Sequence, residues 1–139
     1  MRAHRRTHRR SIRVEFHLPD EAASAGQARR LTSEFLARSR REMAPVEAEQ
    51  IDDARLVVSE LVTNATVHGR SGCRLRLQVC DERLTVEVYD DNPAEPRVRP
   101  LTTEGESGRG LAMVRCLAQR LDVTPLTGGG KRVRAILAI

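Results

Sequence analysis

The sequence contains few aromatic residues: Phe, Tyr and Trp make up 2% of its 139 residues, and Trp is absent. Proteins that bind single-stranded nucleic acid commonly stack the bases on aromatic side chains. Only Phe16, Phe35 and Tyr89 could serve here, which argues against that class of protein. The core must therefore be built from Leu, Val, Ile and Ala, and a chain of this length is expected to form one domain.

Long apolar runs are also missing. No stretch approaches the roughly 18 residues that span a bilayer, and the basic start is not followed by the apolar segment of a secretory signal. The three cysteines, Cys73, Cys80 and Cys116, form no CxxC pair. Reduced thiols in the cytoplasm are the expected state of such cysteines. These absences predict a cytoplasmic protein without a membrane segment.

The basic charge is concentrated at the N-terminus. The formal net charge is +5, and six arginines precede the first acidic residue, so the remainder is close to neutral. We therefore expect residues 1–10 to be a flexible, Arg-rich tail. A contact between this tail and nucleic acid or an acidic partner is the alternative. The near-neutral remainder makes direct nucleic-acid binding the least favoured function.

Several segments alternate between apolar and polar residues, which is typical of half-buried strands. Only Asp81 and Glu82 separate residues 73–80 from residues 83–90, and this short connection predicts a hairpin. The segments that we expect to form strands are 11–18, 73–80, 83–90, 121–126 and 132–139.

Apolar residues recur at helical spacing in residues 21–41, 46–67 and 109–119. Residues 91–107 lack periodicity and contain three prolines, so they are expected to be a long loop, and loops of this kind often close over ligands. This order predicts an α+β fold: a two-layer sandwich of a mixed, mostly antiparallel sheet with helices on one face. Residues 11–139 would form this domain.

The second predicted helix carries a polar ridge. Glu60, Asn64 and His68 are spaced four residues apart, which places them on one helix face. An amide oxygen suits Mg²⁺ and a carboxylate can accept a proton. At a phosphate site, Asn64 could therefore bind Mg²⁺ while Glu60 accepts a proton. The other interpretations are a solvated helix face and, for His68, a helix-end cap.

Asp90 ends a predicted strand immediately before the turn-rich run Asp91-Asn92-Pro93. Such a residue can simply initiate a turn through its own backbone. Alternatively, its carboxylate could accept a hydrogen bond from the exocyclic amine of adenine. Guanine presents a carbonyl at that position, so the same carboxylate would reject it.

A glycine-rich turn leads into the third predicted helix. Gly108 and Gly110 flank Arg109, and glycines let a backbone approach a phosphate closely. The helix N-terminus would aim unpaired N–H groups at the same phosphate, and Arg109 would add a guanidinium. The turn lacks the GK[ST] ending of a P-loop and follows a loop, which argues against a Rossmann site.

The order of these motifs resembles the GHKL superfamily of ATP-binding domains over roughly residues 12–139. SELVTNATVHG is similar to the family's N box, VEVYDDNPAEP to its first glycine box and SGRGLAMV to its second. Within the superfamily, the chain most resembles the stand-alone anti-sigma-factor serine/threonine kinases of actinobacteria. The first glycine box departs from the family pattern, because Asn92 and Ala94 replace its glycines. Near the C-terminus, Lys131-Arg132 replaces a small hydroxyl residue.

The resemblance implies a role for each matching residue. Glu60 would be the general base, Asn64 would bind Mg²⁺, and Asp90 would select adenine. The other residues that would contact ATP are His68, Asn92, Ser107, Gly108, Arg109, Gly110 and Leu111.

The implied function is that of an ATP-dependent kinase that acts as an anti-sigma factor. Its partners would be a sigma factor and an anti-anti-sigma (STAS-type) protein, whose Ser or Thr it would phosphorylate, and it could form a homodimer. The altered glycine box leaves a second hypothesis open. In that hypothesis the same fold sequesters a sigma factor or a related regulator without kinase activity.

Overall fold

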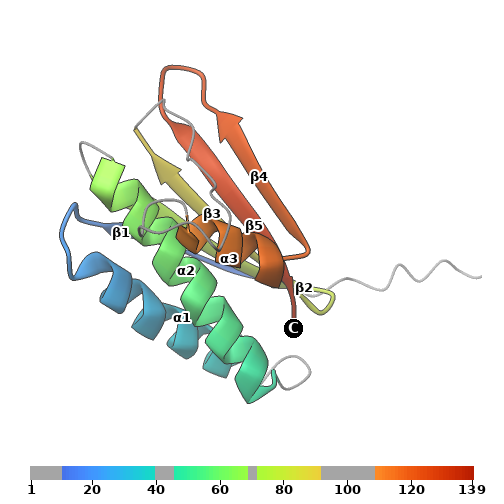
Figure 1. Ribbon diagram of the computed structural model, residues 1–139. Coiled ribbons are helices and arrows are strands. Elements are labelled where there is room, and N and C mark those ends of the chain that lie inside the picture. Colours follow the sequence, from blue (N-terminus) through green and yellow to red (C-terminus); the bar gives the residue numbers. More distant parts are fainter. Residues whose placement is uncertain (1–10, 40–45, 69–71, 92–108) are drawn as a thin grey trace, which may run out of the picture.

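The computed structural model describes residues 11–39, 46–68, 72–91 and 109–139, and these form two layers (Figure 1). Three helices lie on one face of a five-stranded sheet. Among these residues, no helix is both long enough and apolar enough to cross a membrane. The elements in chain order are β1 (Ser11–Leu18), α1 (Ser24–Ser39), α2 (Ala48–His68), β2 (Cys73–Cys80), β3 (Arg83–Asp90), α3 (Arg109–Leu117), β4 (Arg120–Pro125) and β5 (Lys131–Ala138).

The sheet has the strand order β1-β2-β3-β5-β4, and all four pairings in the described residues are antiparallel. The predicted α+β sandwich with helices on one face is thus confirmed. The strand predictions for 11–18, 73–80 and 83–90 coincide with β1, β2 and β3. The predicted tail (residues 1–10) and the predicted lid, except for Asp91, lie outside the described residues.

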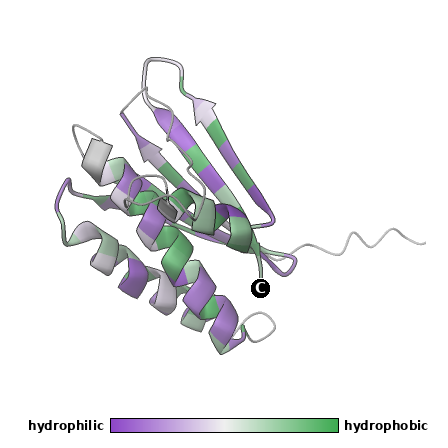
Figure 2. Cartoon of the chain, viewed as in Figure 1, coloured by the Kyte–Doolittle hydropathy of each residue, from purple (hydrophilic) through white to green (hydrophobic). Residues whose placement is uncertain are grey.

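The core lies between the sheet and the helices. Apolar residues alternate with polar ones along the strands (Figure 2), and the inward residues of β2, β3 and β5 are buried. Helix α2 contributes a continuous buried stripe that packs on β3 and against α3. The stripe consists of Ala54, Val57, Val58, Leu61, Val62 and Ala65. This stripe fixes the rotation of α2 and so determines where its polar residues face.

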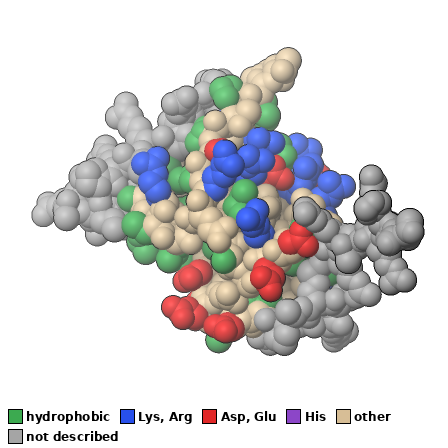
Figure 3. All heavy atoms as spheres, turned by 90° about the vertical axis from the view of Figure 1, so that its right-hand side faces the viewer, with side chains coloured by type: hydrophobic (Ala, Val, Ile, Leu, Met, Phe, Trp, Pro, Cys, Tyr) green, Lys and Arg blue, Asp and Glu red, His purple; other side chains and the backbone are tan. Residues whose placement is uncertain are grey.

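The opposite face of the sheet is charged. The strand registers place five residues side by side in one row, and acidic and basic residues alternate along it. We call it the charged row: Glu15, Arg76, Glu87, Arg134 and Asp122. Lys and Arg side chains also gather on the side of the molecule shown in Figure 3. The two faces of the sheet therefore have opposite character, one apolar beneath the helices and one polar.

The C-terminal ends of α2 and β3 lie at the same end of the molecule as the turn between β4 and β5 (Figure 1). Gly128, Gly129 and Gly130 in this turn have positive φ angles of 91°, 107° and 83°, which suit glycine. A Cβ on Gly130 would also overlap the carbonyl oxygen of Asp90. The turn can therefore pack tightly against the end of β3.

Candidate nucleotide-binding site

Glu60 and Asn64 lie one turn apart on α2, and both side chains are partly buried. Their neighbours Leu61, Val62 and Ala65 point into the core. Because the apolar stripe is buried against the sheet, the two polar residues lie at its edge. This is the arrangement that the four-residue spacing predicts.

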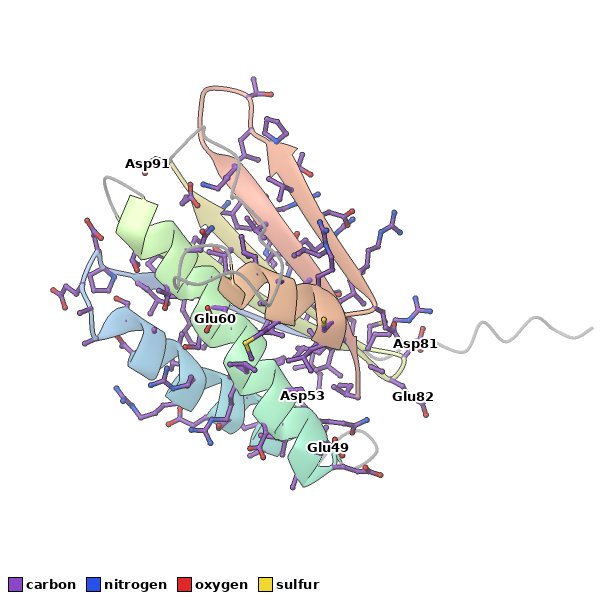
Figure 4. All side chains as sticks on the ribbon, viewed as in Figure 1. Glu49, Asp53, Glu60, Asp81, Glu82 and Asp91 are labelled. Atoms are coloured by element: carbon purple, nitrogen blue, oxygen red, sulfur yellow. The ribbon has the colours of Figure 1, made fainter. Side chains whose placement is uncertain are left out.

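The carboxylate of Glu60 lies against the first turn of α3. A Cβ on Gly110 would overlap the Oε2 and Cδ atoms of Glu60, so only glycine leaves room for this carboxylate. Figure 4 shows Glu60 in the middle of α2, the helix that packs on α3. The first turn of a helix carries unpaired N–H groups and a partial positive charge, which favours anions. The structure thus joins two of the predicted motifs at one point.

Asp90 lies at the other end of the predicted site, on the helix side of the sheet. Its side chain is fully buried, and its Oδ1 accepts a hydrogen bond of 3.0 Å from Lys131 Nζ on the adjacent strand β5. The carboxylate also influences the thiol on β2: burial, together with the negative charge of Asp90, raises the pKa of Cys73 to about 11. The thiol is therefore protonated at neutral pH.

The ion pair with Lys131 is the feature that sequence reasoning missed. The sequence identified Lys131 only as the replacement for a hydroxyl residue. Residues 131, 133, 135 and 137 alternate inward along β5, so Lys131 occupies the first position of an otherwise apolar stripe. That alternation could have predicted an inward-facing ammonium, but not which strand would lie beside it.

A hollow of about 680 Å³ opens across the end of the sheet. Asp90 and Asp91 line it, together with Gly129 and the outward-facing Arg74 and Tyr89. Its volume is within the range of ligand pockets. Glu60 and Asn64 are not among its lining residues, so this hollow does not extend to the polar ridge of α2.

The remaining predicted site residues are placed less completely. Asn92, Ser107 and Gly108 lie outside the described residues. His68 ends α2 and Arg109 begins α3, but their side chains are not described. Leu111 is 4% exposed and packs in the core, so any contact with a phosphate would come from its backbone N–H.

The comparisons with known proteins agree with this fold. Residues 18–137 match the family described as the histidine kinase-like ATPase domain, so the chain belongs to this family. The predicted resemblance to GHKL domains is therefore confirmed.

Within the family, the chain is similar to anti-sigma factors. It is 31% identical over 97 residues to the anti-sigma F factor of Clostridium acetobutylicum, a match that covers 61% of this chain and 68% of that protein. The anti-sigma F factor of Caldanaerobacter subterraneus subsp. tengcongensis is 30% identical over 98 residues, with coverage of 62% and 68%. The resemblance to anti-sigma factors is thus confirmed as well.

A solved structure supports the fold alone. The chain superimposes on a crystal structure of the RsbU and RsbW domains of a Mycobacterium tuberculosis protein with a TM-score of 0.68 and 19% sequence identity. This match covers 91% of the present chain but only 32% of the other chain. The present chain therefore spans about a third of that chain.

The described residues fit a nucleotide better at one end of the site than at the other. At the phosphate end, the Glu60 carboxylate lies against the first turn of α3 next to Gly110, and Asn64 follows one turn later on α2 with an amide oxygen suited to Mg²⁺. At the base end, the carboxylate expected to bind the adenine amine already accepts a hydrogen bond from Lys131. The base end thus contains the ammonium of Lys131 next to the Asp90 carboxylate, and the family pattern does not predict this ammonium.

Proposed function

We propose that the protein is an ATP-dependent serine/threonine kinase that acts as an anti-sigma factor. It would bind a sigma factor and phosphorylate an anti-anti-sigma protein of the STAS type. The observation that supports this most is the position of the Glu60 carboxylate at the first turn of α3, beside Gly110. The similarity to proteins named anti-sigma F factor supports the choice of partners.

Glu60 would act as the general base. Bound ATP would supply the γ-phosphoryl group, and Asn64 would help to hold a Mg²⁺ ion that would neutralise charge on the phosphates. The Glu60 carboxylate would accept the proton of the attacking Ser or Thr hydroxyl as the new O–P bond forms and the bond to ADP breaks. The N–H groups at the start of α3, including that of Gly110, would donate to phosphate oxygens.

Phosphoryl transfer from radiolabelled ATP to the cognate anti-anti-sigma protein tests this proposal. We expect Glu60→Gln to lower the transfer rate by about 100-fold or more, because removal of a general base typically costs this much. Glu49→Gln is a matched control, since Glu49 lies on the same helix and is exposed. A Glu60→Gln protein as active as the wild type would disprove the kinase mechanism.

The second candidate is a regulator that sequesters its partner without kinase activity. The Lys131–Asp90 ion pair favours it, because the ammonium competes for the carboxylate that would bind the base. Calorimetry with ATP and Mg²⁺ separates the two candidates. If the protein gave no binding heat at high nucleotide concentration but still bound its partner, the result would support the sequestering regulator.

Three further features of the proposal remain predictions. Residues 91–107 would close over the bound phosphates, and the Arg-rich residues 1–10 would extend from the domain. The chain would also form a homodimer. Affinity capture with ATP and with ADP would identify the partners that depend on the nucleotide state.

A further inference from the structure

The outer face of the sheet carries more basic than acidic side chains. Among the described residues, no helix covers this face (Figure 1). A row of residues flanks the charged row on each side, and neither of these two rows contains an acid. The flanking row next to the hollow is called the basic row here: His17, Arg74, Tyr89, Arg132 and Thr124. The other flanking row includes Arg13 and Arg120.

The arginines of this face outnumber the carboxylates that neutralise them. Each of the three acidic residues of the charged row pairs with two arginines, at distances between 3.0 and 3.9 Å. Across the three rows there are six arginines and three acids, so positive charge remains in excess. Helix α2 in the other layer contains four acids and one arginine. The two layers therefore differ in charge, and an acidic partner would be steered to the sheet.

Arg74 is held in place without use of its hydrogen-bond donors. Its guanidinium lies 4.2 Å from the centroid of the Tyr89 ring, and the side chain is 38% exposed. Its ion pair with Glu15 is 3.9 Å long, which is beyond hydrogen-bond distance. A cation over a ring face is attracted by the ring itself. The N–H donors of this guanidinium thus remain available for a partner.

The position of Arg74 determines the direction from which a partner can reach it. Arg74 and Tyr89 lie at the rim of the hollow, together with Asp90 and Asp91. The two carboxylates would repel an anion inside the hollow. A carboxylate would therefore approach the guanidinium from the outer face of the sheet, where it can accept two parallel hydrogen bonds.

The mixture of charges on this face favours one kind of partner. A nucleic-acid backbone carries a negative charge at every nucleotide, so some phosphates would lie against the acids of the charged row. A second copy of the chain would bring two faces of the same net charge together. A segment of another protein can place single carboxylates opposite the arginines and neutral or basic residues opposite the acids.

We propose that the outer face of the sheet binds an acidic segment of a partner protein, and that Arg74 is the principal contact. The surface lies on the opposite face of the sheet from α2 and Glu60. The inference therefore goes beyond the proposed kinase function and does not depend on nucleotide binding.

Tyrosine fluorescence offers a test that is specific to this surface. Tyr89 is the single tyrosine of the chain, and Trp is absent. Its emission therefore reports binding near Arg74 and not binding to the Arg-rich residues 1–10. The probe is a peptide that alternates Glu with Ser and has no aromatic residue. We expect a saturable change in emission and a lower affinity in added salt. The same peptide with Gln in place of Glu should give no change.

Substitutions at Arg74 form the second test, in the full-length chain. We expect Arg74→Gln to weaken binding of the Glu–Ser peptide by about 10-fold or more, because hydrogen bonds between charged groups are lost. Arg74→Lys keeps the charge but not the planar fork, and should restore only part of the affinity. Arg55→Gln is the matched control, since it removes the same charge from an exposed position on α2. It should leave the affinity unchanged.

Several results would overturn this inference. One is a Tyr89 emission that the Glu–Ser peptide does not change. Another is an equal loss of affinity in Arg74→Gln and Arg55→Gln, which would assign binding to net charge alone. A single-stranded oligonucleotide of equal charge that binds more tightly than the peptide, and depends on Arg74, would assign the face to nucleic acid. A dimer in sedimentation that Arg74→Gln dissociates would assign it to a second copy.

Discussion

At the scale of single residues, Gly110 shows why a glycine in a motif can have two functions. The sequence predicts that this glycine lets a phosphate approach the backbone. In the structure, the absence of a Cβ also leaves room for the Glu60 carboxylate from α2. One missing side chain thus sets the distance between the proposed base and the start of α3.

Substitution of Gly110 by Ala should therefore separate activity from stability. Alanine favours the helix by about 1 kcal/mol over glycine, and the Glu60 side chain can rotate away from the new Cβ. We expect little change in the free energy of unfolding but a loss of phosphoryl transfer similar to that of Glu60→Gln. Thermal unfolding and the transfer assay measure the two effects.

Gly26→Ala is the control for this experiment. Gly26 lies in α1, and the nearest atom to a Cβ there would be Arg29 Nη2 at 3.4 Å, an ordinary contact. The substitution should stabilise the protein by about 0.5–1 kcal/mol and leave activity unchanged. If Gly110→Ala were folded and fully active, the position of Glu60 beside α3 would not matter for the reaction.

The partner of Asp90 shows what a sequence does not reveal at this scale. Asp90 and Lys131 are 41 positions apart, and their contact depends on which strand lies beside β3. Local periodicity identifies each strand and each inward face. It does not specify that β5, rather than β4, occupies the neighbouring position in the sheet.

At the scale of elements, most of the fold could be predicted because strand and helix patterns are local. The bounds of β2 and β3 agree with the alternation of residues 73–80 and 83–90. The predicted helix ends are less accurate, because helix ends depend on capping contacts. Helix α1 begins at Ser24, three residues after the predicted start, where the Ser24 hydroxyl donates a hydrogen bond of 2.5 Å to the carbonyl of Pro19.

The hairpin between β2 and β3 offers a test at the same scale. Asp81 and Glu82 have φ angles of 51° and 61°, which non-glycine residues rarely adopt. We expect Glu82→Gly to raise the free energy of unfolding by about 0.5–1 kcal/mol, after the entropy cost of glycine in the unfolded chain. Chemical denaturation measures this difference.

Glu82→Ala is the matched variant for the hairpin, because it removes the same carboxylate but keeps a Cβ. It should give no gain, since alanine also disfavours a positive φ. An equal gain from both variants would mean that removal of the negative charge, and not relief of backbone strain, stabilises the turn.

At the scale of the whole molecule, the sheet separates the proposed site from a charged surface. The inner face supports the helices, and the charged row runs across all five strands of the outer face. A hydrogen bond from Arg134 lowers the pKa of Asp122 at one end of the row, with further help from Arg120. The contribution of Asp122 to the free energy of unfolding is thus fully present above the ordinary pKa of a carboxyl group. It is lost as the pH falls through the lowered pKa of the folded state.

Glu87 is the central acid of the charged row, and its side chain is 9% exposed. It lies 3.7 Å from Arg76 and 3.5 Å from Arg132, which come from the strands on either side. We expect Glu87→Gln to lower the free energy of unfolding by about 1–3 kcal/mol, because the surrounding arginines lose a buried counter-charge. Denaturant titration measures the loss.

Glu15→Gln is the comparison within the same row. Glu15 is 35% exposed and also pairs with Arg76, at 3.2 Å, but water screens this pair more strongly. Its loss should cost at most about 1 kcal/mol. Added salt should shrink the Glu87→Gln effect, because repulsion between the remaining arginines is screened. Equal losses at both positions, unaffected by salt, would show that the row contributes through packing and not through its charges.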